Sequence, residues 1–300
     1  MPTMRRAVAT VTIAVLLATC AGCEARVYGN PGHQPEGPGL TAVPAAPTDA
    51  TPLAPPAAAA ASLADLALRA EQAVAEAAER GADISFRMLD RQTGRQVAAG
   101  APGLATASVV KLFIADDLLM REPDLSAADR ESLDVMLRSS DDNAAEEFWN
   151  RGGGEEIIGR VAARYGLAAT APPSNGRWWN TVSTTEDLVR FYDKLLDGSG
   201  GLPPERANII LNDLAQSTPE GIDGYPQRFG IPDGLPGEPV AVKQGWMCCI
   251  GPDWMHLSSG IVGADRRYVM VVYALQPTDD ATARNTITDA IRTIFPTGRI

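Results

Sequence analysis

Strand-like segments stand at both ends of the foldable part of this chain, and helix-like segments fill the middle. Residues 83–100 read as two short strands around a turn at 91–94, and residues 239–275 hold three more apolar, strand-like runs. Residues 62–81 and 281–295 have a helical period. Because a strand needs partners, the pattern predicts one sheet built from both chain ends, with helices packed on it and a helical lobe beside it. The fold class is therefore α/β, in the α+β sense.

The middle of the chain holds five further segments in which apolar residues recur with a helical period. They are residues 108–120, 124–140, 155–167, 184–196 and 203–216. Ser62 and Ser126 stand where two of the predicted helices need N-caps. Residues 171–183 and the Pro/Gly-rich residues 218–238 show no period, so we expect loops there.

The first residues read as an export signal and not as part of the fold. Arg5 and Arg6 precede an apolar run at 7–18 that is too short to span a bilayer comfortably. The run ends in LATCAGC, and small residues before a cysteine make it resemble a bacterial lipoprotein signal. Cleavage before Cys23 would leave that cysteine lipidated, for example with palmitate, and Cys20 is the alternative. A plain secretory signal is the competing interpretation.

This interpretation divides the chain into three segments. Residues 1–22 are the signal peptide, residues 23–60 are the lipidated cysteine and its tether, and residues 61–300 are the folded domain. The tether has eight prolines between Pro31 and Pro56 and little apolar surface to bury. We therefore expect an extracytoplasmic protein that is anchored to the cell membrane by a lipid, with its domain held away from the surface.

Composition and missing motifs exclude several functions. The formal net charge of −11 argues against a nucleic-acid partner, which would need a basic surface. The chain has no HExxH, P-loop, GxGxxG before a helix or zinc-like cysteine spacing, so we expect no metal and no cofactor. We also expect a monomer. A Ser-His-Asp triad would need His256, which we expect at the surface or at a strand edge. Cys248 and Cys249 are adjacent, and both a free pair and a vicinal disulfide are open.

Only three of the 26 basic residues are lysines, and two of the three have catalytic contexts. Arginine cannot lose its proton, whereas a desolvated lysine can act as a base. Lys111 follows Ser108 by one helical turn, so the two side chains share a face as nucleophile and base would. The competing interpretation is a serine N-cap with a snorkelling lysine. Lys243 lies in a predicted strand, and Gly245 there would let another backbone approach closely.

Three motifs in this order resemble a known family. SVVK at 108–111, SDD at 140–142 and KQG at 243–245 are similar to the SxxK, SDN and KTG motifs of the serine β-lactamase and penicillin-binding protein superfamily. The resemblance is closest to the class A branch and covers residues 62–300. It implies an antiparallel sheet formed by both chain ends and flanked by helices. Because Ser108 and Ser140 are close in sequence, the all-helical lobe should be reduced.

The resemblance also implies residue roles. Ser108 would be acylated, and Lys111 would be its base or proton relay. Ser140 would pass a proton to the leaving group. Lys243 would hold a substrate carboxylate and assist Ser140. The backbone N–H groups of Ser108 and Trp246 would form the oxyanion hole.

Three departures from the family pattern limit these roles. Asp142 takes the place of the family asparagine, and a carboxylate cannot donate a hydrogen bond to a substrate carbonyl; a one-residue slip would put Asn143 there instead. Gln244 replaces the family threonine as a substrate contact. Residues 168–183 contain no Asp or Glu, so the omega loop lacks an acid that could activate water for deacylation.

We therefore expect an exported serine hydrolase or acyltransferase that acts on a peptide, amide or ester in the cell envelope and is a poor β-lactamase. The alternative is a catalytically impaired lipoprotein that uses the same cleft for binding or a structural role. Trp178 and Trp179 would either cover the cleft or pack in the core.

Overall fold

The structure is a computed structural model, and it describes residues 62–101 and 103–300. The predicted signal peptide, the tether and the lipidation sites Cys23 and Cys20 lie outside these residues. Within the described ranges, no helix combines the length and apolar character needed to cross a membrane.

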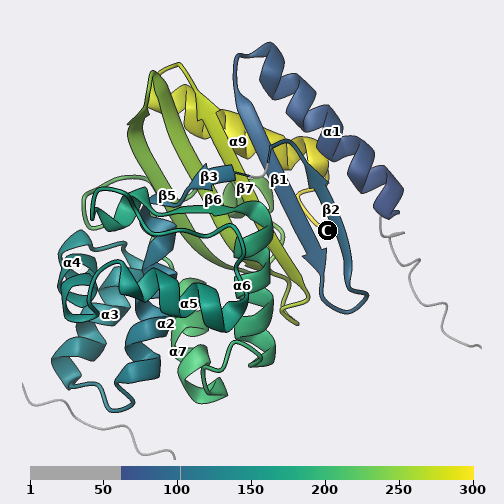
Figure 1. Cartoon of the computed structure of the whole chain (residues 1–300). Coiled ribbons are helices and arrows are strands. Elements are labelled where there is room, and N and C mark those ends of the chain that lie inside the picture. Colours follow the sequence, from purple (N-terminus) through teal and green to yellow (C-terminus); the bar gives the residue numbers. More distant parts are fainter. Residues whose placement is uncertain (1–61, 102) are drawn as a thin grey trace, which may run out of the picture. The chain divides into compact units, whose positions relative to one another are not determined.

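One antiparallel sheet of five strands is built from both ends of the described chain (Figure 1). In spatial order its strands are β2 (Arg95–Ala99), β1 (Asp83–Asp90), β7 (Tyr268–Gln276), β6 (Asp253–Val262) and β5 (Val240–Ile250). The early strand β1 pairs directly with the late strand β7, with Phe86 opposite Val272. This topology confirms the predicted sheet and leaves β5 as an edge strand.

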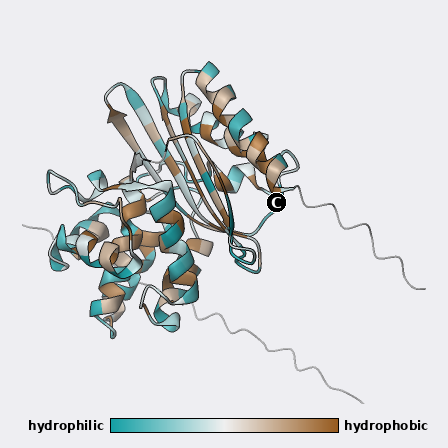
Figure 2. Cartoon of the chain, turned by 45° about the vertical axis from the view of Figure 1, so that its right-hand side comes forward, coloured by the Kyte–Doolittle hydropathy of each residue, from teal (hydrophilic) through white to brown (hydrophobic). Residues whose placement is uncertain are grey.

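Two long helices cover one face of the sheet (Figure 1), and apolar residues line the elements on this side (Figure 2). α1 (Leu63–Glu79) begins after Ser62, whose Oγ accepts the N–H of Asp65 at 3.2 Å, so the predicted N-cap is confirmed. α9 (Asp280–Ile294) packs beside α1 and against β7. The buried side of α1 includes three alanines, whose small side chains permit close packing. The short α8 (Ile231–Gly234) lies against α9.

A helical lobe adjoins the other face of the sheet (Figure 1). Its helices are α2 (Lys111–Arg121), α3 (Ala127–Arg138), α4 (Asp142–Arg151), α5 (Glu156–Tyr165), α6 (Thr185–Asp197) and α7 (Pro204–Ala215). α2 is the central helix, because every residue from Lys111 to Leu119 is buried. A helix buried on all sides has no solvated face, so its polar groups need partners inside the protein.

Asp116 and Asp117 are buried acids of α2, and α5 supplies partners for both. Tyr165 donates to Asp116 Oδ1 at 2.6 Å, and Arg164 also bonds this carboxylate. Arg160 donates two hydrogen bonds of 2.8 Å to Asp117. Such pairs are costly to break once they are buried. They fix α2 against α5.

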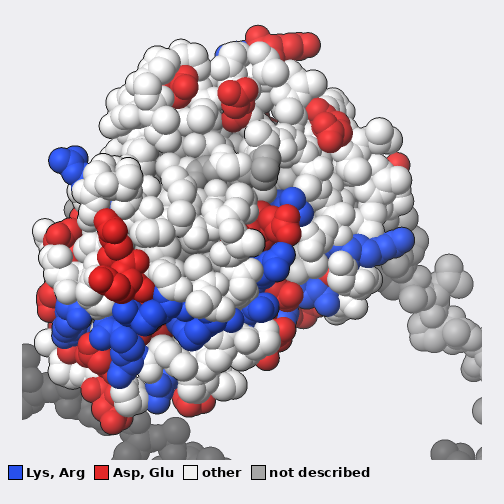
Figure 3. All heavy atoms as spheres, viewed as in Figure 1, with Lys and Arg blue, Asp and Glu red and all other residues white. Residues whose placement is uncertain are grey.

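The surface of the described domain carries arginines with acidic residues close beside them, as Figure 3 shows for one face. Pairs in the lobe include Arg151 with Asp129 and Arg190 with Glu186, each at 2.9 Å. Their charges are therefore largely compensated by near neighbours.

The helix predicted over residues 108–120 differs in its first turn. Residues Ala107–Val110 form a 3-10 turn, η1, and α2 begins only at Lys111. Ser108 therefore lies in a tight turn ahead of the α-helix. Its side chain remains one turn from Lys111, as the spacing predicts.

Four further elements were not expected from sequence. α4 is a short helix that begins at the N-cap Asp141, whose Oδ1 accepts the N–H of Ala144 at 2.7 Å. The predicted loop 171–183 holds a second 3-10 turn, η2 (Trp178–Asn180), and the start of β4 (Val182–Thr184). β4 pairs with β3 (Gly103–Ala105) in a separate two-stranded sheet. η2, β3 and β4 have three residues each, too few for periodicity to reveal them, whereas α4 is as long as the predicted α5.

Candidate active site

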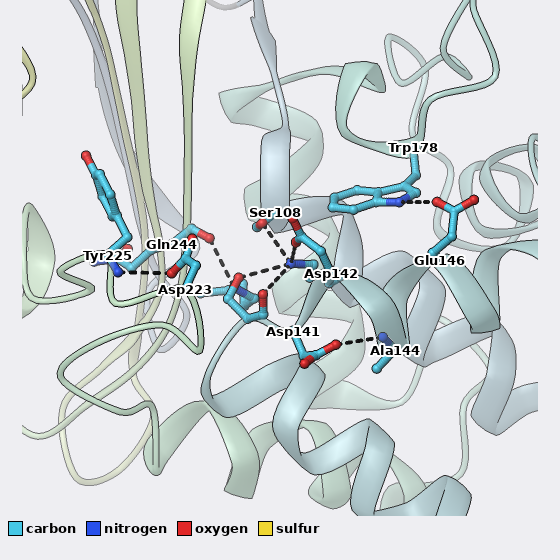
Figure 4. A network of polar contacts seen from close by, with 12 residues as sticks. Ser108, Asp141, Asp142, Ala144, Glu146, Trp178, Asp223, Tyr225 and Gln244 are labelled. Atoms are coloured by element: carbon cyan, nitrogen blue, oxygen red, sulfur yellow. Dashed lines mark hydrogen bonds and ion pairs between the residues drawn. The ribbon is translucent and has the colours of Figure 1, made fainter. Parts of the chain in front are cut away.

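Three segments far apart in sequence meet at one cluster of polar side chains (Figure 4). η1 carries Ser108, the turn before α4 carries Ser140, and β5 carries Lys243. Lys111 Nζ donates to Ser108 Oγ at 2.9 Å and to Ser140 Oγ at 3.1 Å. Lys243 Nζ donates to the same Ser140 Oγ at 2.8 Å. The fold thus brings the two motif serines and the two motif lysines into a single hydrogen-bonded chain.

Lys111 is 0% exposed and lies among four oxygens. Besides the two serine hydroxyls, its Nζ contacts the backbone carbonyl of Ser140 at 2.8 Å and Asp142 Oδ1 at 2.6 Å. Burial lowers the pKa of Lys111 below the ordinary lysine value, while the Asp142 carboxylate opposes this by favouring the charged form. The serine N-cap interpretation fails, because Ser108 caps no helix and Lys111 does not snorkel to solvent.

Lys243 is 1% exposed, and its Nζ donates to Gln244 O at 3.1 Å as well as to Ser140 Oγ. Burial lowers the pKa of Lys243 well below the ordinary value, and the neighbouring charge of Lys111 lowers it further. Ser140 Oγ is therefore held between two amines that can each exchange a proton with it.

The backbone is strained next to both serines. Ala107, directly before Ser108, has φ +42°, and Ser140 has φ +60°. These left-handed conformations cost side-chain-bearing residues roughly 1–2 kcal/mol each. A third such residue, Arg266, lies in the turn between β6 and β7. Strain at both serines indicates that packing, and not local preference, sets their positions.

Gly245 permits the close approach of β5 to η1. A Cβ at this position would lie 2.7 Å from the carbonyl oxygen of Thr106 and 3.3 Å from the backbone nitrogen of Ser108. Any larger residue would push the strand and the turn apart. The predicted backbone approach at Gly245 is therefore confirmed. Trp246 follows directly, which brings this part of β5 beside the Ser108 turn.

A cavity of about 240 Å³ opens above the two serines. Its lining residues are Ala107, Ser108, Ser140, Asp142, Trp178, Trp179, Asp223, Trp246, Met247 and Cys248. Lys111 and Lys243 are not in this lining and lie beneath its floor. Asp223 was missed from sequence, because it lies in the long aperiodic loop that folds back onto the site.

Asp142, and not Asn143, meets the lysine. Asp142 Oδ1 accepts from Lys111, whereas Asp141 is occupied as the N-cap of α4. Because Ser140 and Asp142 both contact Lys111, the frame without a slip is the one that the structure adopts.

The expectation that Gln244 contacts substrate in place of the family threonine is wrong. The Gln244 side chain is buried, and its Nε2 donates to the carbonyls of Gln227 at 2.9 Å and Phe229 at 2.7 Å. Successive side chains of a strand point to opposite faces, so Lys243 and Gln244 diverge. Gln244 anchors the long loop and does not line the cavity.

Trp178 has both of the roles considered for it, since it is buried in the core and also lines the cavity. Its ring centroid lies 5.0 Å from Lys111 Nζ, and its Nε1 donates to Glu146 Oε2 at 3.0 Å. Figure 4 shows Glu146 on the far side of the indole from Ser108. Glu146 is absent from the lining, so it does not replace the acid missing from residues 168–183.

His256 does not lie at the surface, which corrects its predicted position. It is 0% exposed in β6, and its Nε2 is 2.8 Å from the hydroxyl of Tyr225. The sequence allows either a free pair or a bridge at Cys248 and Cys249. The two cysteines form a vicinal disulfide, and Cys248 lies in the cavity wall. Within residues 62–101 and 103–300, no cluster of three or more His, Cys, Asp or Glu side chains could hold a metal ion.

Sequence comparisons give relatives over most of the chain. The sequence model of the beta-lactamase enzyme family matches residues 123–297. Proteins named "Putative lipoprotein LppW" in Mycobacterium bovis and Mycobacterium tuberculosis are 65% identical to this chain over 237 residues. The match covers 77% of this chain and 76% of each relative.

Solved structures are similar at low identity. The TLA-3 extended-spectrum beta-lactamase has a TM-score of 0.64 at 12% identity, over 77% of this chain and 98% of its own. A mutant of PBP-A in an acyl-enzyme complex with penicillin G has 0.63 at 17%, over 78% and 96%. The class A beta-lactamase from Mycobacterium abscessus has 0.60 at 19%, over 76% and 98%. At such identities the likeness shows the fold alone.

Proposed function

The chain belongs to the beta-lactamase enzyme family, and from this premise we propose that it is a serine hydrolase or acyltransferase that forms an acyl-enzyme at Ser108. The observation that carries the proposal is the hydrogen-bonded chain from Ser108 through Lys111 and Ser140 to Lys243. A nucleophile bonded to a desolvated lysine is an established form of activated serine.

The proposed first half-reaction uses each member of this chain. Neutral Lys111 takes the proton of Ser108 Oγ, and the oxygen attacks the acyl carbon of a peptide, amide or ester. Ser140 gives its proton to the leaving group as the carbon–heteroatom bond breaks. Lys243 and Lys111 both contact Ser140 Oγ and can restore that proton. The N–H groups of Ser108 and Trp246 are the proposed donors to the oxyanion.

The second half-reaction is proposed to be slow with water. No acidic residue stands in residues 168–183, and Glu146 is separated from the serines by Trp178. Without a base to activate water, the acyl group persists unless a better nucleophile accepts it. We therefore propose a poor β-lactamase, which forms an adduct more readily than it turns over.

We propose that the enzyme works outside the cytoplasm, lipid-anchored at Cys23 or Cys20. The order of residues 5–23 and the name of the mycobacterial relatives support this location. The mass of the N-terminal peptide of membrane-extracted protein tests it, because an unmodified peptide beginning elsewhere would contradict the anchor.

A second candidate is a binding protein that has kept the cleft and lost turnover. Asp142 in place of an amide, together with the missing omega-loop acid, favours this alternative. It predicts ligand binding in the cavity with no covalent adduct.

The deciding experiment is intact-mass detection of an adduct after incubation with a reporter penicillin and with activated esters. We expect a stoichiometric adduct that is absent in Ser108→Ala and formed about a thousandfold more slowly in Lys111→Met. Ser199→Ala, in the exposed loop after α6, is the matched control and should react normally. If no acyl donor labels the wild type, the binding-protein alternative stands. Fast, complete penicillin turnover would contradict slow deacylation.

A further inference from the structure

We propose that the group bound beside Ser108 is cationic, an ammonium or guanidinium, and that Asp142 and Asp223 select it. The inference rests on the proposed acyl-enzyme function and adds the charge of its substrate. It opposes the carboxylate-binding role that the family resemblance implies for Lys243.

The first observation is the charge of the cavity wall. Asp142 and Asp223 are the only ionisable side chains among its lining residues, and none of these residues is Lys or Arg. The Asp142 side chain is 74% exposed, and Asp223 is also exposed. Because both carboxylates face the solvent-filled space, a ligand that enters the cavity meets negative charge first.

The second observation is that neither lysine is available to a substrate carboxylate. Lys243 is buried below the floor, and its Nζ donates to Ser140 Oγ and Gln244 O. Lys111 is also buried and already meets Asp142 at 2.6 Å. Burial lowers the pKa of both amines, which weakens the positive charge that they could offer. An anionic ligand would gain little from them and would be repelled by the wall.

The third observation is the aromatic lining. Trp178, Trp179 and Trp246 all border the cavity. Indole rings attract cations through their faces, most strongly where water is excluded. Trp246 stacks on Tyr225 with ring centroids 3.8 Å apart, and the Tyr225 N–H donates to Asp223 Oδ1 at 3.0 Å. The loop before α8 therefore positions both the carboxylate of Asp223 and the ring of Tyr225, which stacks on Trp246.

Asp223 also has an unused acceptor. Only its Oδ1 receives a hydrogen bond from the described residues, so Oδ2 is open to a ligand donor. Asp142 and Asp223 come from different elements, the start of α4 and the loop before α8 (Figure 4). A cation between them would gain two carboxylates and an aromatic surface together.

The test compares three acyl donors of similar size and different charge. They are the 4-nitrophenyl esters of 4-guanidinobenzoic acid, 4-acetamidobenzoic acid and terephthalic acid, with charges of +1, 0 and −1. The rate of Ser108 acylation is followed by nitrophenolate release and intact mass, and is divided by the imidazole-catalysed rate of each ester. We expect the cationic ester to react at least about tenfold faster than the neutral one, and the anionic ester to be slowest. Equal rates, or a preference for the anion, would overturn the inference.

Variants separate Asp223 from general electrostatics. Asp223→Asn can still accept the Tyr225 N–H, and it should reduce the ratio of cationic to neutral rates about tenfold. Asp124→Asn, in the exposed loop after α2, removes the same charge away from the site and should leave that ratio unchanged. An unaltered ratio in Asp223→Asn, or an equal fall in Asp124→Asn, would remove Asp223 from the proposal.

A binding measurement keeps the inference distinct from the acyl-enzyme proposal. The non-reactive amides 4-guanidinobenzamide and terephthalamate are titrated while the tryptophan fluorescence of the cavity is followed. We expect the cation to bind at least about tenfold more tightly than the anion, and the difference to shrink at high salt. If no ester acylates Ser108 but the cation is preferred, only the acyl-enzyme function fails. If the neutral ester acylates Ser108 without charge preference in rate or binding, only the inference fails.

Discussion

At the scale of single residues, Asp142 has the largest effect on the protonation of Lys111, the proposed base. Its carboxylate is 2.6 Å from Lys111 Nζ, at the position where the resemblance to the SDN motif implies an amide. Burial of Lys111 lowers its pKa, and the Asp142 charge and hydrogen bond partly reverse this. Asp142 therefore sets how much of Lys111 is neutral, and only neutral Lys111 can accept the proton of Ser108.

This relation predicts how acylation depends on pH. Acylation of Ser108 should rise with pH through the lowered pKa of Lys111, because deprotonation creates the base. Asp142→Asn removes the charge that holds the proton on Lys111, so its pKa falls further and the rising limb should move to lower pH. The measurement is the second-order acylation rate with a neutral activated ester between pH 5 and 10, a range that brackets such groups. Asp124→Asn should keep the wild-type profile, and a shift of the Asp142→Asn limb to higher pH would contradict the role of Asp142.

At the scale of elements, the site depends on how β5 meets η1. Neither element is unusual by itself, yet Ser108 is placed by Gly245 on one side and by strained backbone at Ala107 on the other. α2 is in turn held by buried ion pairs with α5. The positions of the proposed catalytic groups are therefore properties of packed elements, which local sequence does not fix.

A glycine substitution tests this packing. Gly245→Ala would put a Cβ 2.7 Å from Thr106 O, so β5 or η1 must move. We expect acylation of Ser108 to slow by about tenfold to a hundredfold, because displacements of about 1 Å have such effects. Gly159→Ala is the matched control, since its Cβ would meet nothing within 4 Å on an exposed position of α5. It should leave the rate unchanged and stabilise the fold by about 0.5–1 kcal/mol. A normal rate in Gly245→Ala would show that the close approach is dispensable.

At the scale of the whole described domain, His256 joins the sheet, the long loop and α9. Its Nε2 lies 2.8 Å from the Tyr225 hydroxyl and 3.3 Å from Asp280 Oδ1, and Arg284 bonds the same carboxylate. Burial lowers the pKa of His256 from 6.5 to about 4, although Asp280 opposes the shift. The folded protein therefore keeps this imidazole neutral under conditions in which the unfolded chain would protonate it.

The sign of the resulting pH dependence follows from linkage. The unfolded chain binds a proton at His256 below pH 6.5, whereas the folded protein binds it only near pH 4. The contribution of His256 to the free energy of unfolding is thus fully present above pH 6.5 and is lost as the pH falls to about 4. This contribution is about 3 kcal/mol. Urea denaturation at about pH 7.5, above this interval, and at about pH 4.5, near its lower end, measures most of the loss. His256→Gln, which does not titrate, should lose less stability over the interval, and an identical loss in both proteins would exclude His256 as its source.

Much of the fold could be predicted, because its signals are local. Periodicity gave five main strands and most helices, and the caps at Ser62 and Ser126 were placed correctly. The one-turn spacing of Ser108 and Lys111 dictates that their side chains meet. β3 and β4 were missed because three residues are too few to show a period, whereas α4 was missed although it is as long as α5.

The amino-acid sequence alone specifies which groups are available: two serines, two lysines in a lysine-poor chain, and an aspartate two residues after Ser140. Which of them lie together depends on the tertiary structure. It buried His256, turned Gln244 away from the site and brought Asp223 to its wall. The physical reason is range: spacing within one helix or strand fixes neighbours a few residues apart. Contacts between distant loops depend on the packing of the whole core, and no local pattern encodes that packing.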